Sequence, residues 1–245
     1  MGVRSNHSHS RSKLAAISAR VLIEFEPRRE SAKHLEMELI ESHMKIAYSI
    51  PVHQEFLRLG TPSEPILAEA AAQYMSRLSD IPPVLADYSS NGLVEKGESG
   101  ELAARLLLIT AYDNAVKNKQ LRSKLFSDPV SLFSFLRELF GEDNCQILFK
   151  STCTRSAPAT RSRVQTTVSS ELPFEAMYKH AYVRFTHFAR FDKANEINTR
   201  TIPAAFIRGM AVQCDKNHES IDIVVPIVMK NSGILSESDM SAIFI

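Results

Sequence analysis

The sequence is poor in cysteine and lacks long apolar runs. Its 245 residues include only three cysteines, an odd number without the paired spacing of a zinc site. Such usage is typical of a protein kept in a reducing, intracellular compartment, with nucleus and cytoplasm not distinguished. No apolar run reaches the length of a membrane span, and the N-terminus lacks the apolar core of a secretory signal. We therefore predict no membrane partner.

The net charge and the missing motifs exclude further function classes. A formal net charge of +1 gives the whole molecule no electrostatic preference for nucleic acid, so only a local basic patch could supply one. The sequence contains no GxGxxG and no GxxxxGK[ST], which excludes nucleotide binding through a P-loop. It also contains no GxSxG and no cysteine–histidine arrangement that would indicate a nucleophilic enzyme.

The composition is that of an ordinary globular protein, with 44% hydrophobic residues and enough of them for a real core. Residues 1–13 are basic and without acids, so they are predicted to form a disordered tail, with a transit peptide as the alternative. Residues 14–90 are expected to form a helical region. Residues 91–245 are expected to form a core with a sheet, interrupted by a flexible insertion at about 150–171. The predicted fold class is therefore α+β.

Apolar periodicity and capping residues predict the helices. The strongest candidate is 100–117, whose wide apolar stripe implies burial on most sides. Residues 30–48 form an amphipathic pattern, and Ser63 as N-cap with Pro65 in the first turn starts a helix that runs to about Leu78. The further expected helices are 53–59, 128–141, 173–188 and 201–214.

Strands and a loop are predicted from β-branched runs and from proline. The clearest strand signal is 220–229, and 240–245 resembles a second strand. Residues 146–149 could form a short strand. The segment 80–91 is predicted to be a loop, because it contains Pro82-Pro83 and Asn91-Gly92.

Two acidic residues are placed where they could form a metal site. Glu101 lies at the start of the central helix, and Asp222 lies among apolar residues of the strand 220–229. A carboxylate in apolar surroundings needs a cation or another partner, and Mg²⁺ prefers carboxylate oxygens. Structural roles stay open for both: Glu101 also suits the positive end of a helix, and Asp222 also suits a strand edge or a turn cap.

The order of these elements resembles the core of a nuclease family. The segments IDIVVPIVM and MSAIFI resemble the sheet of a PD-(D/E)XK restriction-endonuclease-like core. The segment GLVEKGESGELAARLLL resembles a block of expanded, uncharacterised fungal families, which are similar to the nuclease-like domains of transposon-derived and Crinkler-type proteins. The resemblance covers about 47–245. It implies Mg²⁺-dependent cleavage of DNA, with Glu101 and Asp222 as catalytic residues and metal ligands.

The same resemblance implies that the nuclease core is incomplete. In the family the last strand continues into a Gln/Glu-x-Lys motif, whose lysine helps to hold developing charge. That motif is missing after MSAIFI, so the chain is expected to be a C-terminally truncated remnant that can lack activity. The alternative is a non-catalytic helical module that binds protein or nucleic acid.

Basic residues in two segments are candidates for contacts with phosphates. Arg155, Arg161 and Arg163 lie in the insertion, and Lys179 and Arg184 alternate with aromatic residues in the segment 173–188. The alternatives are a solvated loop for the first group and an aromatic core for the second.

Two histidines, His180 and His187, lie seven residues apart and would share one face of the helix predicted there. Because no third ligand lies near them in the sequence, we predict packing or surface roles for both rather than a metal site.

Overall fold

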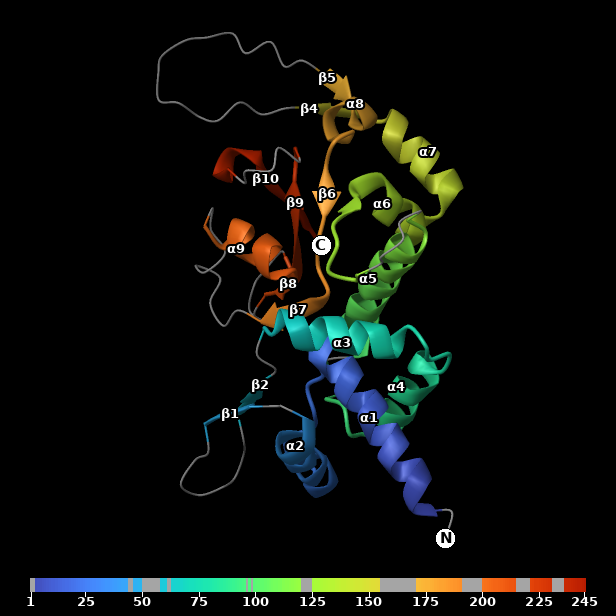
Figure 1. Ribbon diagram of the computed structural model, residues 1–245, viewed down its shortest axis with the longest axis vertical. Helices are drawn as coiled ribbons and strands as arrows, with labels where there is room; N and C mark the ends of the chain where they lie inside the picture. Colours follow the sequence, from blue (N-terminus) through green and yellow to red (C-terminus); the bar gives the residue numbers. More distant parts are fainter. Residues whose placement is uncertain are drawn as a thin grey trace.

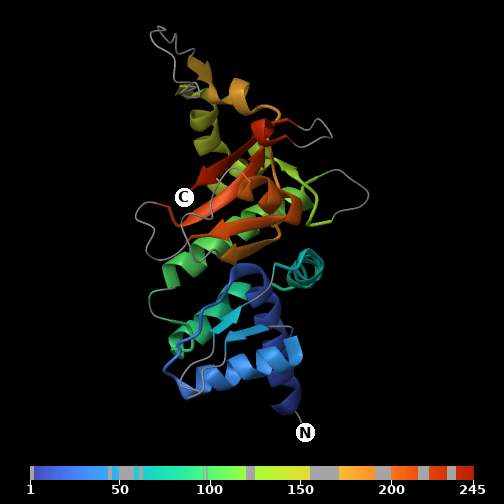
Figure 2. The same cartoon turned by 90° about the vertical axis from the view of Figure 1, so that its left-hand side faces the viewer.

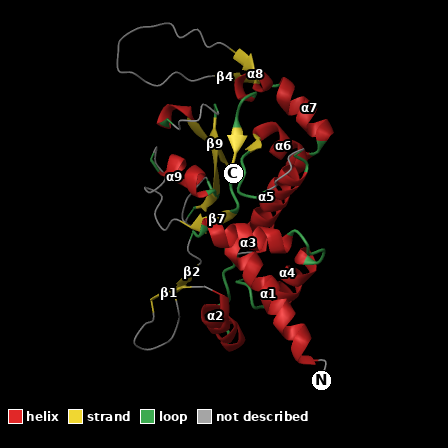
Figure 3. Cartoon of the chain, viewed as in Figure 1, coloured by secondary structure: helices red, strands yellow, loops and turns green. Residues whose placement is uncertain are grey.

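Helices and a mixed sheet make up the part of the chain that the computed structural model describes, which confirms the α+β class (Figures 1 and 3). The described residues are 3–43, 46–49, 58–60, 63–95, 97, 99–119, 125–154, 171–190, 200–214, 221–230 and 236–245. The helices are α1 Val3–Val21, α2 Glu30–His43, α3 Pro65–Met75, α4 Ile81–Ser90, α5 Ser99–Lys117, α6 Leu132–Phe140, α7 Glu142–Lys150, α8 Phe174–Tyr178 and α9 Thr201–Arg208.

The strands form one larger sheet and two small pairs. They are β1 Ile46–Ser49, β2 Arg58–Gly60, β3 Val130–Ser131, β4 Thr152–Thr154, β5 Glu171–Pro173, β6 Tyr182–Val183, β7 His187–Arg190, β8 Met210–Gln213, β9 Ile223–Val228 and β10 Met240–Phe244. The larger sheet has the order β3-β6-β9-β8-β7, with β10 also paired with β9. The pair β7–β8 is parallel and the other pairs are antiparallel. The small pairs are β1–β2 and β4–β5.

Strand β9 is the centre of the larger sheet. One edge pairs with β10, while the other edge pairs with β8 at Ile223 and Val224 and with β6 at Ile227 and Val228. All six residues of β9 are buried. A run of apolar residues without polar alternation is expected for a strand that is covered on both faces.

Helices cover both faces of β9. Ile223, Val225 and Ile227 join the main cluster of buried hydrophobic residues, which includes α5 and α6, whereas Val224 joins a smaller cluster beneath α9. This follows from the alternation of side chains along a strand. Figures 1 and 2 show α9 on one side of the sheet and α5 with α6 on the other.

The N-terminal helices share the core of the sheet. In Figure 1, α1, α2 and α4 lie at the end of the molecule that carries the N-terminus, and the sheet lies beyond α3. Leu14 and Ile17 of α1 are fully buried in the same cluster as Ile227. The predicted division at residue 90 therefore does not separate two hydrophobic cores.

Several predicted elements are confirmed. Helix α5 matches the segment 100–117, and β9 and β10 match the two predicted strands. Pro65 begins α3, and Gly141 ends α6 with φ of 80°. Helix α2 ends at His43 rather than at residue 48, which lies in β1.

Two predictions for the N-terminal third are wrong. The segment 1–13, expected to be disordered, is helical from Val3, because α1 is anchored at its other end by buried residues such as Leu14. The segment 80–91, expected to be a loop, contains α4. Its two prolines, Pro82 and Pro83, fall in the first helical turn, where a missing N–H costs no hydrogen bond.

Four further elements differ from the predictions. Residues 146–149 lie in α7 rather than in a strand, and the helix expected at 173–188 ends at Tyr178, after which β6 and β7 follow. The helix expected at 201–214 ends at Arg208 and continues as β8. Residues 58–60 form β2, while the rest of the helix predicted at 53–59 lies outside the described residues. The insertion begins and ends in the strand pair β4–β5, and its residues 155–170 also lie outside the described residues.

Candidate functional site

Glu101 lies in the first turn of α5, where two donors hold its carboxylate. Gln213 Nε2 donates to Glu101 Oε2 at 2.7 Å, and Arg105 Nη1 donates to the same oxygen at 3.5 Å. Arg105 is fully buried, and its Nε and Nη2 donate to the carbonyl oxygens of Val21 and Leu22 at 2.7 and 3.1 Å. The Glu101 side chain remains 34% exposed. The protein therefore orients this carboxylate while leaving it accessible.

Asp222 lies one residue before β9, and backbone hydrogen bonds fix its position. Its carbonyl accepts from the Cys214 N–H at 2.8 Å, and its own N–H donates to the Ile245 carbonyl at 2.8 Å. The residue is exposed. Burial raises the pKa of the Cys214 thiol, and the charge of Asp222 raises it further. The Asp222 carboxylate therefore lies close enough to the Cys214 thiol to affect its ionisation.

Folding brings Glu101 and Asp222 to the same end of the sheet, but on opposite faces. Gln213, which bonds Glu101, pairs with Ile223, the residue after Asp222. Because side chains alternate along a strand, Gln213 and Ile223 face α5. The adjacent residue Cys214 packs in the cluster beneath α9, and the charge of Asp222 acts on its thiol. The two carboxylates thus do not face one another, and among the described residues no three or more His, Cys, Asp or Glu side chains are grouped to hold a metal ion.

The basic residues predicted to contact phosphates divide into three groups. Arg184 bonds the protein itself, because its Nε donates to the Ser127 carbonyl at 2.8 Å and its Nη1 to the Ile207 carbonyl at 3.1 Å. Lys179 is exposed directly after α8. The insertion residues Arg155, Arg161 and Arg163 lie outside the described residues.

The aromatic residues of the segment 173–188 belong to the core. Phe185 and Phe188 are fully or nearly fully buried, and the Phe185 ring lies 4.8 Å from that of Tyr112 between centroids. Tyr178 packs on Phe174 at 4.6 Å. The aromatic-core explanation is therefore confirmed for these residues.

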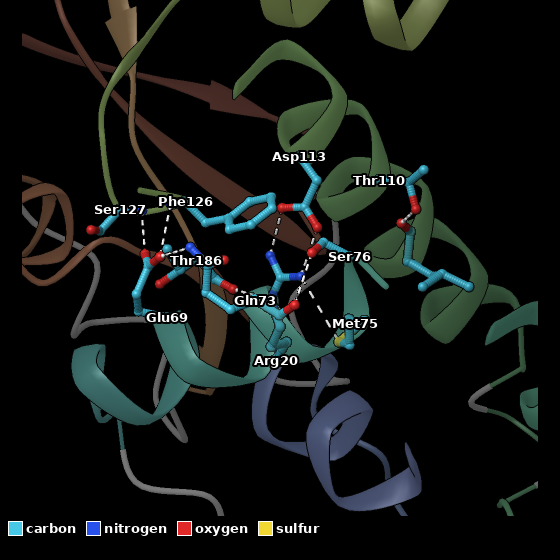
Figure 4. A network of polar contacts seen from close by, with 11 residues as sticks. Arg20, Glu69, Gln73, Met75, Ser76, Thr110, Asp113, Phe126, Ser127 and Thr186 are labelled. Atoms are coloured by element: carbon cyan, nitrogen blue, oxygen red, sulfur yellow. Dashed lines mark hydrogen bonds and ion pairs between the residues drawn. The ribbon is translucent and has the colours of Figure 1, made fainter. Parts of the chain in front are cut away.

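A buried ion pair that was not predicted joins α1, α5 and the residue before β7 (Figure 4). Arg20 is fully buried, and its Nη1 and Nη2 donate to the two carboxylate oxygens of Asp113 at 2.7 and 2.8 Å. Its Nε donates to the Thr186 carbonyl at 2.7 Å. The sequence does contain an indication of this pair. Arg20 and Asp113 are charges of opposite sign within strongly apolar segments, and buried charges are normally paired.

Glu69 of α3 forms a second polar connection in the same view (Figure 4). Its carboxylate accepts from the backbone N–H groups of Phe126 and Ser127 at 3.0 and 2.6 Å, and from Gln73 Nε2 at 2.9 Å. These bonds fix the loop before β3, whose Ser127 carbonyl in turn accepts from Arg184. Glu69 therefore has a structural role.

A third missed group surrounds His187 at the start of β7. The ring is buried, and its Nε2 lies 2.9 Å from Ser63 Oγ and its Nδ1 lies 3.0 Å from Thr186 Oγ1. Burial, followed by the charges of Arg20 and Arg208, lowers the pKa of His187 to about 4. His180, by contrast, is exposed. No residue near Ser63 in the sequence indicated that it would contact a histidine so far along the chain. Ser63 was predicted as the N-cap of α3, but the N-cap is Glu64.

Comparison with known proteins gives a match to a family model. Residues 4–152 match the family model described as a domain of unknown function, DUF8736. The matched range contains Glu101, Arg20 and Asp113, whereas Asp222 and most of the larger sheet follow it. No curated protein and no solved structure matches the chain. Within the described residues, no helix combines the length and the apolar character needed to cross a membrane.

Proposed function

Since the chain belongs to the DUF8736 family, for which no function is given, we propose from its geometry that it is a remnant of a metal-dependent nuclease-like domain that acts on DNA. One observation supports this proposal: α5 and β9, far apart in the sequence, bring Glu101 and Asp222 to the same end of the sheet, with Gln213 between them. The resemblance to the PD-(D/E)XK core requires this convergence of helix and strand.

The carboxylates at this end of the sheet are ligands of the type that Mg²⁺ prefers, but they are not arranged to bind one ion together. Mg²⁺ usually takes one or two protein carboxylates together with water and phosphate oxygens. Both hydrogen bonds that hold Glu101 end on Oε2, so Oε1 is the oxygen that Glu101 would present to a cation. Asp222 is exposed on the other face. A bound Mg²⁺ would supply charge stabilisation and an activated water for phosphodiester hydrolysis, but the separated carboxylates fit a remnant better than an efficient enzyme.

The test measures metal binding and DNA cleavage separately. We expect weak Mn²⁺ or Mg²⁺ binding to the full chain by isothermal titration calorimetry, and weaker binding still in Glu101→Gln and Asp222→Asn. Slow nicking of supercoiled plasmid should depend on the same two residues. Glu175→Gln, an exposed glutamate of α8, is the matched control. Metal binding that is absent, or that is unchanged in both variants, would refute the proposal.

The second candidate function is a non-catalytic module that binds protein or nucleic acid. It is favoured by the opposite faces of the two carboxylates and by the bonds that tie Glu101 to Arg105 and Gln213. For DNA as the partner, this function predicts affinity that falls steeply with salt, without any metal-dependent turnover. An intracellular location, proposed from the three free cysteines, agrees with either function.

A further inference from the structure

A serine hydroxyl and a histidine ring meet where the chain enters α3. Ser63 is half-buried two residues before the helix, and its Oγ lies 2.9 Å from His187 Nε2. This contact joins the helical part of the molecule to the first residue of β7. A hydrogen-bonded serine and histidine, with the histidine oriented by a third group, is the arrangement that activates a nucleophile.

The hydrogen bonds around His187 allow the tautomer in which Ser63 is a donor to the ring. Thr186 Oγ1 donates its single proton to the Gly209 carbonyl at 3.2 Å. We therefore assign the His187 proton to Nδ1, from which Thr186 Oγ1 accepts at 3.0 Å. Nε2 is left as an acceptor, and the Ser63 hydroxyl donates to it. The sulfur of Met210, 3.3 Å from Ser63 Oγ, is a weaker acceptor for the same proton.

Positive charge lies beside the same hydroxyl. Arg208 Nε donates to Ser63 Oγ at 3.1 Å, and its Nη2 donates to the Ser63 carbonyl. Arg208 comes from the last turn of α9 and is exposed. A guanidinium in this position stabilises negative charge that develops on or next to Ser63 Oγ.

We propose that Ser63 is a nucleophile that attacks small carboxylic esters, with His187 as its general base and Arg208 as the donor to the oxyanion. A short acyl group is implied, because Ser63 is half-buried against the Met210 sulfur. This site is independent of Glu101 and Asp222 and does not rest on the nuclease proposal.

The reaction balances with water as the only co-substrate. Ser63 Oγ bonds to the ester carbonyl carbon while its proton moves to His187 Nε2, and the carbonyl oxygen becomes an oxyanion facing Arg208. The bond to the alcohol oxygen then breaks, and the alcohol leaves with the proton from Nε2. Water attacks the acyl-serine by the same route, which releases the carboxylic acid and restores Ser63.

The charges around His187 define the pH profile of this activity. The ring faces Ser63 before α3, Arg20 from α1 and Arg208 from α9, and burial together with the two arginines lowers its pKa to about 4. The imidazole is therefore unprotonated throughout the neutral range but accepts a proton weakly. We expect a slow reaction with a flat rate from about pH 5 to 8, rather than a rise near the ordinary histidine pKa of about 6.5.

The test uses the full chain, p-nitrophenyl acetate as the substrate and a fluorophosphonate as the covalent probe. We expect the probe to be found on Ser63 by peptide mass spectrometry. Ester hydrolysis should fall at least about tenfold in Ser63→Ala, because this variant lacks the nucleophile. Thr186→Val should leave Ser63 in place and lower the rate while shifting the pH profile, because the ring loses its orienting partner.

The matched control is Ser76→Ala at the C-cap of α3, a half-buried serine whose Oγ donates to the Gln73 carbonyl rather than to a histidine. It should retain both labelling and hydrolysis. Melting curves show whether each variant folds, and the site of labelling in the wild-type chain decides the question even if Ser63→Ala does not fold. An unlabelled Ser63 in the folded wild-type chain, or equal hydrolysis in a folded Ser63→Ala variant, overturns the proposal.

Discussion

At the scale of single residues, polar side chains that are buried and fully paired connect distant parts of the chain. Arg20 uses all of its guanidinium nitrogens, with two on Asp113 and one on the Thr186 carbonyl. Arg105 likewise bonds the end of α1 and the Glu101 carboxylate. Truncating one partner of such a buried pair typically costs about 3–5 kcal/mol, because the other charge stays buried without compensation.

His187 gives a stability prediction with a definite sign. Its pKa of about 4 in the folded chain lies below the ordinary value of 6.5, so between these values the unfolded chain binds a proton that the folded chain does not. The contribution to the free energy of unfolding is complete above pH 6.5 and is lost as the pH falls towards 4, by about 3 kcal/mol. Urea unfolding at several pH values measures it.

Two variants separate the contribution of His187 to the pH dependence of stability from that of the other seven histidines. His187→Gln should show a smaller loss of stability between pH 6.5 and 4 than the wild type. His180→Gln, which changes an exposed histidine, should follow the wild-type curve. Equal pH dependence in His187→Gln and the wild type would contradict the lowered pKa.

At the scale of elements, the turn between α9 and β8 depends on one glycine. Gly209 has φ of 65°, in the left-handed region, where an added Cβ costs about 1–2 kcal/mol. We therefore expect Gly209→Ala to lower the free energy of unfolding by about that amount. Gly100→Ala is the control with the opposite sign, because Gly100 lies within α5, has open space around it and should gain helix propensity. Urea midpoints of both variants test the pair, and equal shifts would contradict the expectation.

The elements that the sequence predicted correctly are those with a strong local signal. Helix α5 has a wide apolar stripe, and β9 consists of β-branched residues apart from Pro226. The errors arose where a local signal had two meanings. Pro82 and Pro83 suit a loop or a first helical turn, and the segment 173–188 has helical spacing but is divided into α8, β6 and β7 by pairing with distant strands.

The candidate sites show the same limit. The sequence indicated Glu101 and Asp222 as carboxylates that could bind a metal ion, and folding brings them to one end of the sheet. The face on which each lies depends on the register of β8 against β9, which composition does not encode. The contact of Ser63 with His187 depends on how α3 meets β7, so neither residue could be recognised from its neighbours in the sequence.

At the scale of the whole molecule, the shared core predicts that α1 and the sheet unfold together. Ile17 of α1 is fully buried in the cluster that includes Val225 of β9. We expect native-state hydrogen exchange to give the same opening free energy for amides of α1 from residue 14 onward and of β9. Ile17→Val should lower both by about 0.5–1.5 kcal/mol, whereas Ile66→Val, at an 85% exposed position, should lower neither. Protection lost in α1 alone would indicate that the two parts open separately.

The long separation between Arg20 and Thr186 also orders events during synthesis. Arg20 leaves the ribosome well before Thr186, because the carbonyl that its Nε bonds lies 166 residues further along the chain. At about 5–20 residues per second, the N-terminal helix waits roughly ten to thirty seconds for that partner, with Leu14, Ile17 and Val21 still uncovered by the sheet. During this interval a nascent chain offers an apolar surface that the finished protein hides, and this is the surface on which a chaperone would act.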